Sequence, residues 1–86
     1  MIYQHRLLNN YKTTIMEVLV FKTNIRYRKH INAIEPHIAR QSGIIKWNVD
    51  LKDSDKILRI EAIDLHPAKI ESLVKNAGYT CEELRD

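Results

Sequence analysis

Two neighbouring segments of alternating polarity constrain this chain more than any other feature. The first, IIKWNVDL, spans residues 44–51, and its odd-numbered positions are apolar: Ile45, Trp47, Val49 and Leu51. The second, KILRIEAI, spans residues 56–63 and alternates in the same way, with Leu58, Ile60 and Ala62 on its apolar side. A period of two residues is typical of a strand with one dry and one wet face. The polar turn KDSDK joins the segments, so they predict an antiparallel hairpin in a sheet that is covered on one side.

A strand and a helix are predicted before this hairpin. Residues 14–22, TIMEVLVFK, are β-branched and apolar, which favours a strand. Spacings of three and four then place four residues on one helix face: Tyr27, Ile31, Ile34 and Ile38. Pro36 lacks the N–H that would bond back to residue 32, so we expect the helix to kink or restart there. Gly43 is the candidate for its C-cap.

A second helix and a last strand are predicted after the hairpin. Pro67 suits the first helical position, with Asp64 or His66 near the cap. The buried stripe of this helix consists of Ile70, Leu73, Val74 and Ala77. Gly78 ends it, and residues 79–84 form a short edge strand. The order β-α-β-β-α-β predicts an α+β, ferredoxin-like sandwich, with a four-stranded antiparallel sheet in the order 4-1-3-2 and two helices on one face.

The length of 86 residues indicates one domain. We expect a flexible N-terminal tail over residues 1–13 and the domain over residues 14–86. The longest apolar run, residues 18–21, is far too short for a membrane span, and we expect no membrane association. The N-terminus does not resemble a secretory signal and there is one cysteine, so we expect a cytoplasmic protein.

Positive charge is concentrated at the N-terminal side of the chain. Residues 1–30 carry six Lys/Arg against one Glu, whereas residues 31–86 carry eight against ten Asp/Glu. Arg26, Arg28 and Lys29 stand where the first helix begins, although free N–H groups there already carry partial positive charge. Such a group suits a phosphate or a carboxylate. We therefore predict a site for an anion or an acidic protein partner, formed by Thr23, Asn24, Arg26, Arg28, Lys29, His30 and Tyr79.

The predicted topology places this basic loop beside residues distant in sequence. The loop after the first strand and the start of the last strand lie at one edge of the sheet, so Tyr79 and Cys81 should approach the loop. The hairpin carrying Asp50, Asp53 and Asp55 emerges at the same end. Two interpretations need no partner: a solvated basic helix face, or pairing of the cations with the hairpin aspartates.

From about Met16 to Leu84 the chain resembles a heavy-metal-associated domain of the copper-chaperone type. The resemblance rests on the element order, on Gly43-Ile44 before the second strand, on ILRIE, and on Ala77-Gly78-Tyr79. It implies the ferredoxin-like scaffold. The family's Met-Thr-Cys-x-x-Cys loop matches residues 22–27, but Asn24 and Tyr27 stand in place of the cysteines, and Lys22 in place of the methionine. Residues 47–62 also resemble a set of short uncharacterised bacterial proteins with this scaffold.

An amide and a phenol do not supply the soft ligands that Cu(I) needs. His30 and His37 are seven residues apart, about 10 Å along a helix, which is too far to chelate one ion. We therefore predict no metal site and no cofactor. The alternative is a metal-binding or metal-transfer protein that uses Cys81 and a histidine such as His30.

Other functional classes find less support. Recognition of RNA on such a sheet needs exposed aromatics, and the predicted open face carries Arg59 and Glu61 while Trp47 points inward. Phe21 is the one aromatic that could lie on that face. A Gly-rich phosphate loop and a nucleophile elbow are both missing, so we do not expect an enzyme. The sequence thus predicts a small binding module, and the exposed edges of the second and fourth strands offer self-association as a further alternative.

Overall fold

The computed structural model describes residues 6–7 and 15–85, with side chains described from Met16 onward. The elements in chain order are β1 (Arg6–Leu7), β2 (Ile15–Thr23), α1 (Arg28–Ala39), β3 (Ile44–Asp50), β4 (Ile57–Ile63), α2 (Pro67–Asn76) and β5 (Cys81–Glu83). Of the predicted tail over residues 1–13, Arg6–Leu7 pairs with the start of β2. The other tail residues lie outside the described part, and the domain boundary at residue 14 stays a prediction.

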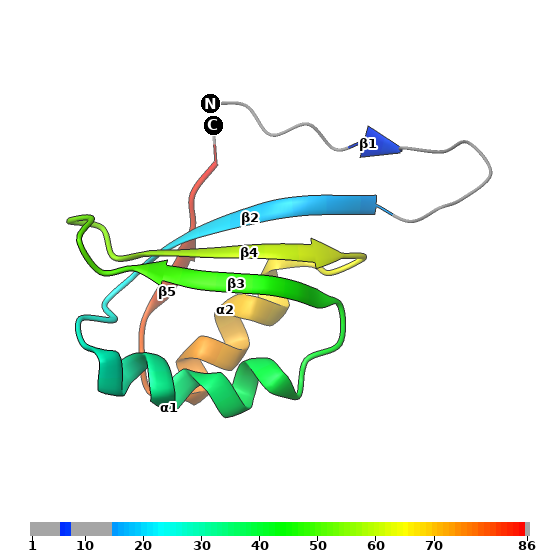
Figure 1. Cartoon of the computed structure of the whole chain (residues 1–86). Helices are drawn as coiled ribbons and strands as arrows, with labels where there is room; N and C mark the ends of the chain where they lie inside the picture. Colours follow the sequence, from blue (N-terminus) through cyan, green and yellow to red (C-terminus); the bar gives the residue numbers. More distant parts are fainter. Residues whose placement is uncertain (1–5, 8–14, 86) are drawn as a thin grey trace.

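The predicted sandwich is confirmed. β2 pairs with β4 on one side and with β5 on the other, and β3 pairs with β4, all antiparallel. The order β5-β2-β4-β3 is the predicted 4-1-3-2 order of the four main strands. Both helices cover the same face of the sheet (Figure 1). The two right-handed crossovers of a split βαβ unit account for this arrangement.

The core lies between the sheet and the helices. Its largest fully buried side chains are Phe21, Ile25, Ile34, Leu58, Ile60, Ile70 and Val74. Phe21 therefore lies in the core and not on the open face, where the sequence had left it a possible place. β2 has apolar residues on both faces, so alternation alone did not fix which face Phe21 occupies. Within the described residues, the open face thus loses its one candidate aromatic from β2.

Helix α1 is one continuous helix that contains Pro36, so of the two predicted outcomes the restart is wrong and the kink stays a prediction. Pro36 is exposed, while Ile34 and Ile38 on either side of it are buried in the core and fix both turns. Tyr27 is the N-cap residue with 56% of its surface exposed, which corrects its predicted place on the buried face. The C-cap is Arg40, not Gly43.

Gly43 has a different role, at the start of β3. Its φ is +93°, and an added Cβ would lie 2.8 Å from the Ile63 carbonyl oxygen. The Ile63 N–H donates to the Gly43 carbonyl oxygen at 2.8 Å, so the two backbones approach closely here. The register is irregular between Ile44 and Lys46. This bulge leaves Ile45 51% exposed, which corrects its predicted place on the inner face.

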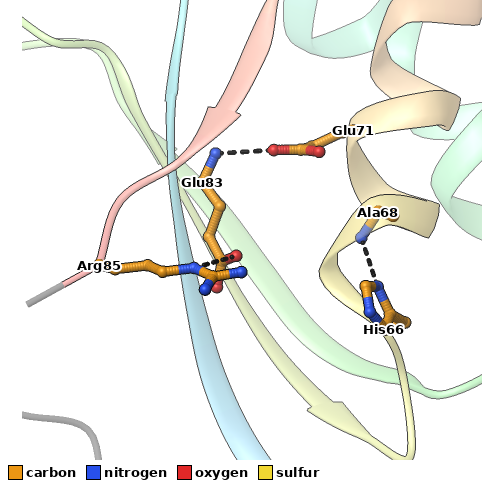
Figure 2. Close-up of polar contacts among 5 residues, drawn as sticks. All are labelled: His66, Ala68, Glu71, Glu83 and Arg85. Atoms are coloured by element: carbon orange, nitrogen blue, oxygen red, sulfur yellow. Dashed lines mark hydrogen bonds and ion pairs between the residues drawn. The ribbon is translucent and has the colours of Figure 1, made fainter.

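Helix α2 begins as predicted, with Pro67 in its first turn and His66 at the N-cap. The His66 Nδ1 accepts a hydrogen bond from the Ala68 N–H at 3.1 Å (Figure 2). The short strand β5 is attached to this helix because the Glu83 N–H donates to Glu71 Oε2 at 2.9 Å. The α2–β5 contact thereby holds the last strand against the edge of β2.

Candidate partner-binding site

The loop between β2 and α1 is anchored by Thr23. Its buried hydroxyl donates to the Lys56 carbonyl oxygen at 2.6 Å and accepts from the Ile25 N–H at 3.1 Å. The Thr23 N–H also donates to the Asp55 carbonyl oxygen at 3.2 Å. The loop is thus fixed to the β3–β4 hairpin. Thr23 is buried, so it supports the loop and does not face solvent.

Asn24 joins the loop to the start of β5. Its Oδ1 accepts a hydrogen bond from the Thr80 N–H at 2.9 Å, across 56 residues of sequence. Cys81 pairs with Thr23 in the β2–β5 register. The expected approach of residues 79–81 to the basic loop is therefore present, and it depends on the residue that replaces the first cysteine of the resembled motif.

His30 caps the start of α1. Its Nδ1 accepts from the Arg26 N–H at 3.0 Å and from the Tyr27 N–H at 3.4 Å. A ring nitrogen that accepts carries no proton, so the neutral ring has its proton on Nε2. The ring also lies between two aromatic rings, with centroids 5.1 Å from Tyr27 and 5.0 Å from Tyr79. Because the first turn of α1 has no acidic residue, His30 fills the role of the glutamate of a capping box.

The cations of this loop point to solvent. Arg26, Arg28 and Lys29 are exposed, and across residues 16–85 none of them forms an ion pair. Lys29 Nζ lies 5.9 Å from the centroid of the exposed Tyr27 ring. The structure thus gathers three cations and one aromatic around a well-held backbone.

The hairpin aspartates do not neutralise these cations. Asp50 Oδ1 accepts from the N–H groups of Lys52 and Asp53, at 3.0 and 3.3 Å. Asp53 Oδ1 accepts from the Asp55 N–H at 2.7 Å, and Asp55 lies 4.0 Å from Lys22 Nζ. Two of the three carboxylates thus cap their own turn, and the third pairs with a lysine outside the loop.

Burial disfavours the thiolate form of Cys81, which is the form that binds metals. Cys81 is 5% exposed, and burial is the main cause that raises the pKa of its thiol to about 12. The Glu71 carboxylate raises this pKa further, while Lys75 opposes the shift. The thiol is therefore protonated at neutral pH.

The geometry gives His30 no free imidazole nitrogen either. For Nε2 to bind a metal, the proton would have to move to Nδ1, which would break the bonds from Arg26 and Tyr27. The described residues contain no group of three or more His, Cys, Asp or Glu side chains that could hold an ion.

The structure also has a groove that was not anticipated from the sequence. This groove of about 520 Å³ lies between α1 and β3, at the side of the sheet away from β5. Its lining includes Arg28, so it begins next to the basic loop. The groove is lined by exposed polar residues of α1 and half-buried apolar residues of β3. Only the fold brings these two sets of residues together, so the sequence pattern does not show the groove.

Comparison with known proteins identifies the class of fold. The chain matches no protein-family model and no curated protein. Among solved structures it is similar to the yeast copper transporter domain CCC2A, with a TM-score of 0.69 and 17% identity over 80% of this chain and 96% of the other. It is also similar to the copper(I)-loaded first domain of CCS, the human copper chaperone for SOD1, with a TM-score of 0.64 and 15% identity over 77% and 89%.

A third similar structure is the apo HMA domain of a copper chaperone for superoxide dismutase, with a TM-score of 0.69 and 12% identity over 94% of this chain and 80% of the other. The chain thus has a heavy-metal-associated-like, ferredoxin-like βαββαβ fold, as the sequence resemblance implied. Within the described residues, the helices are too short and too polar to cross a bilayer.

Proposed function

We propose that this protein is a non-catalytic binding module whose β2–α1 loop docks an acidic protein partner. The observation that carries the proposal is the set of three exposed cations, Arg26, Arg28 and Lys29, without a carboxylate partner in the described part of the chain. Lys29 Nζ lies 5.9 Å from the centroid of the exposed Tyr27 ring, and Arg26 and Arg28 are the residues on either side of Tyr27 in the chain. Aromatic and arginine side chains are the residue types that most often dominate binding energy at interfaces.

The backbone beneath these side chains supports the proposal. Thr23, Asn24 and His30 fix the loop through hydrogen bonds to the hairpin, to the start of β5 and to the helix N-terminus. A partner would therefore order the exposed side chains but not the loop itself, which lowers the entropic cost of binding. Carboxylates are the preferred partner chemistry because arginine pairs with them in a two-pronged geometry.

Metal binding through Cys81 and His30 is the alternative that the fold of the similar copper proteins suggests. The contacts of both residues give it less support, because the thiol is buried and protonated and the imidazole Nδ1 is engaged. A titration with Cu(I) or Zn(II), followed by NMR, tests it: shifts at Cys81 and His30 at stoichiometric metal would favour this alternative. We keep the cytoplasm as the proposed compartment, in which a free thiol such as Cys81 stays reduced.

A titration of the ¹⁵N-labelled protein with a short peptide rich in Asp and Glu tests the proposed site. We expect amide shifts confined to residues 24–30 and 79–80, and weaker binding as salt increases. The combined substitution Arg26→Ala, Arg28→Ala and Lys29→Ala should abolish these shifts. Its matched control removes three cations elsewhere: Lys52→Ala, Lys69→Ala and Lys75→Ala. Equal loss in both variants, or shifts away from the loop, would overturn the proposal.

A further inference from the structure

The outer edge of β3 has hydrogen-bonding groups without a neighbouring strand in the described residues. β3 is the last strand of the sheet and pairs with β4 alone (Figure 1). The bond between Gly43 and Ile63, together with the bulge at Ile45 that shifts the alternation by one residue, sets which backbone groups of β3 face β4. It directs the backbone groups of Lys46, Asn48 and Asp50 toward β4. The N–H and C=O groups of Trp47 and Val49 therefore point away from the sheet.

The groove between α1 and β3 lies along this free edge. Its apolar floor is formed by Ile31, Trp47, Val49 and Leu51, which are partly buried and pack against the core. Arg28 and Glu35 line its helix side, two turns apart on α1. A strand added to β3 would thus place every second side chain against apolar surface.

We propose that the occupant of this edge is β3 of a second copy of the chain, paired antiparallel about a two-fold axis at Asn48. In this register Trp47 of one copy exchanges both backbone bonds with Val49 of the other, and the same pair recurs across the axis. All four outward-pointing residues of the two strands are then used. The two sheets join into one, with the helices of both copies on the same face.

The charges on the open face select this register. Lys46 and Asp50, both exposed, come to lie opposite each other twice, once on either side of the axis. A register centred on Val49 would place Lys46 opposite Lys52. A register centred on Trp47 would place Lys46 opposite Asn48 and leave Asp50 opposite Ile44. Asn48 is therefore the centre at which both charges find an opposite partner.

The helices are also complementary under this two-fold axis. The axis reverses the direction of α1 in the second copy, so the Arg28 end of one helix approaches the Glu35 end of the other. The bulge at Ile45 ends the regular part of β3 and limits the pairing to Lys46–Asp50. Since the same edge is used by both copies, the pairing closes as a dimer and does not continue as a fibre.

Sedimentation in reductant over a range of protein concentrations tests the proposal. We expect the wild-type chain to dimerise, and Lys46→Glu to weaken the dimer at least about tenfold because two attractive pairs become repulsive. Asp50→Lys should do the same. An equimolar mixture of these two variants should dimerise again, since each altered side chain then meets an opposite charge. Lys69→Glu, at an exposed position of α2 outside the groove, is the control with the same change in charge and should leave dimerisation unchanged.

Cross-linking tests the register independently of affinity. In this register the Asn48 residues of the two copies lie opposite each other as a non-hydrogen-bonded pair, with their Cα atoms about 4.5 Å apart. Asn48→Cys should thus form an intermolecular disulfide under mild oxidation. Lys46→Cys, two residues from the axis on the same exposed face, should not. A wild-type chain that stays monomeric, a mixture that fails to dimerise, or equal cross-linking of both variants would each overturn the proposal.

Discussion

Both helices of this protein are capped at the N-terminus by a histidine, but the charged residues around the two N-termini differ. In both, a histidine Nδ1 accepts backbone N–H groups: His30 at the start of α1 and His66 at the start of α2. Neither helix has an acidic residue in its first turn. Three exposed cations surround only the first of these two starts. Since the cap of α2 forms without them, the cations at α1 are not needed for capping, which leaves them free for binding.

We expect the largest change in the free energy of unfolding from a substitution in the loop that precedes α1. Thr23→Val removes the hydroxyl that bonds Lys56 and Ile25, and leaves a half-buried carbonyl and a buried N–H without their partner. We expect a loss of about 2 kcal/mol in the free energy of unfolding. Urea denaturation measures it, with Thr80→Val as an exposed control. A loss below about 0.5 kcal/mol would show that the loop before α1 needs no anchor.

The buried thiol of Cys81, which pairs with Thr23 before α1, should make the stability of the fold depend on pH. The pKa of Cys81 is raised to about 12, so the folded state retains a proton that the unfolded chain releases near pH 9. Stability that is complete below pH 9 is therefore lost as pH rises toward 12. Between pH 8 and 10.5 we expect the wild type to lose about 1–2 kcal/mol more than Cys81→Ala. Parallel pH profiles of the two proteins would contradict this expectation.

Substitution of the two capping histidines compares the helix starts directly. We expect His30→Ala and His66→Ala each to lower the free energy of unfolding by about 1 kcal/mol. His30→Glu and His66→Asp should recover most of the loss, because a carboxylate accepts the same bonds and favours a helix N-terminus. Thermal unfolding by circular dichroism provides the measurement. If the acidic replacements recover nothing, ring contacts with Tyr27 and Tyr79 would be the main role of His30.

The smallest stability effect should follow removal of the cations themselves. Arg26→Ala together with Arg28→Ala should leave the free energy of unfolding unchanged or raise it by about 0.5 kcal/mol, since positive charge is unfavourable at a helix N-terminus. The same variant should lose binding of the acidic peptide. A clear destabilisation would instead assign the two arginines a structural role and would remove the contrast with α2.

The hairpin and the strand order could be predicted because alternation and connectivity leave few choices for a chain of this length. Three details could not. β2 is apolar on both faces, so its pattern does not place Phe21. Ile44 and Ile45 have the same side chain, so a polarity pattern does not show the bulge at Ile45. Pro36 is tolerated in α1 because its buried neighbours Ile34 and Ile38 hold the helix.

The sequence predicted the residues of the candidate site, but not the contacts that hold them. The charge of residues 26–30 indicated the place, and the topology predicted the approach of Tyr79 and Cys81. The role of His30 depends on which ring nitrogen faces the backbone, and this is set by the three-dimensional path of residues 26–27. The groove beside β3 joins residues from a helix and a strand, so no local pattern marks it.

The two glycines should differ in how much sequence variation they tolerate. Both have positive φ, but a methyl group at Gly43 would meet the Ile63 carbonyl oxygen at 2.8 Å, whereas one at Gly78 would meet nothing within 4 Å. In a library of random variants selected for folding, replacements of Gly43 should therefore be depleted across all residue types. At Gly78 the backbone angle is the one obstacle, and residues such as asparagine should survive there.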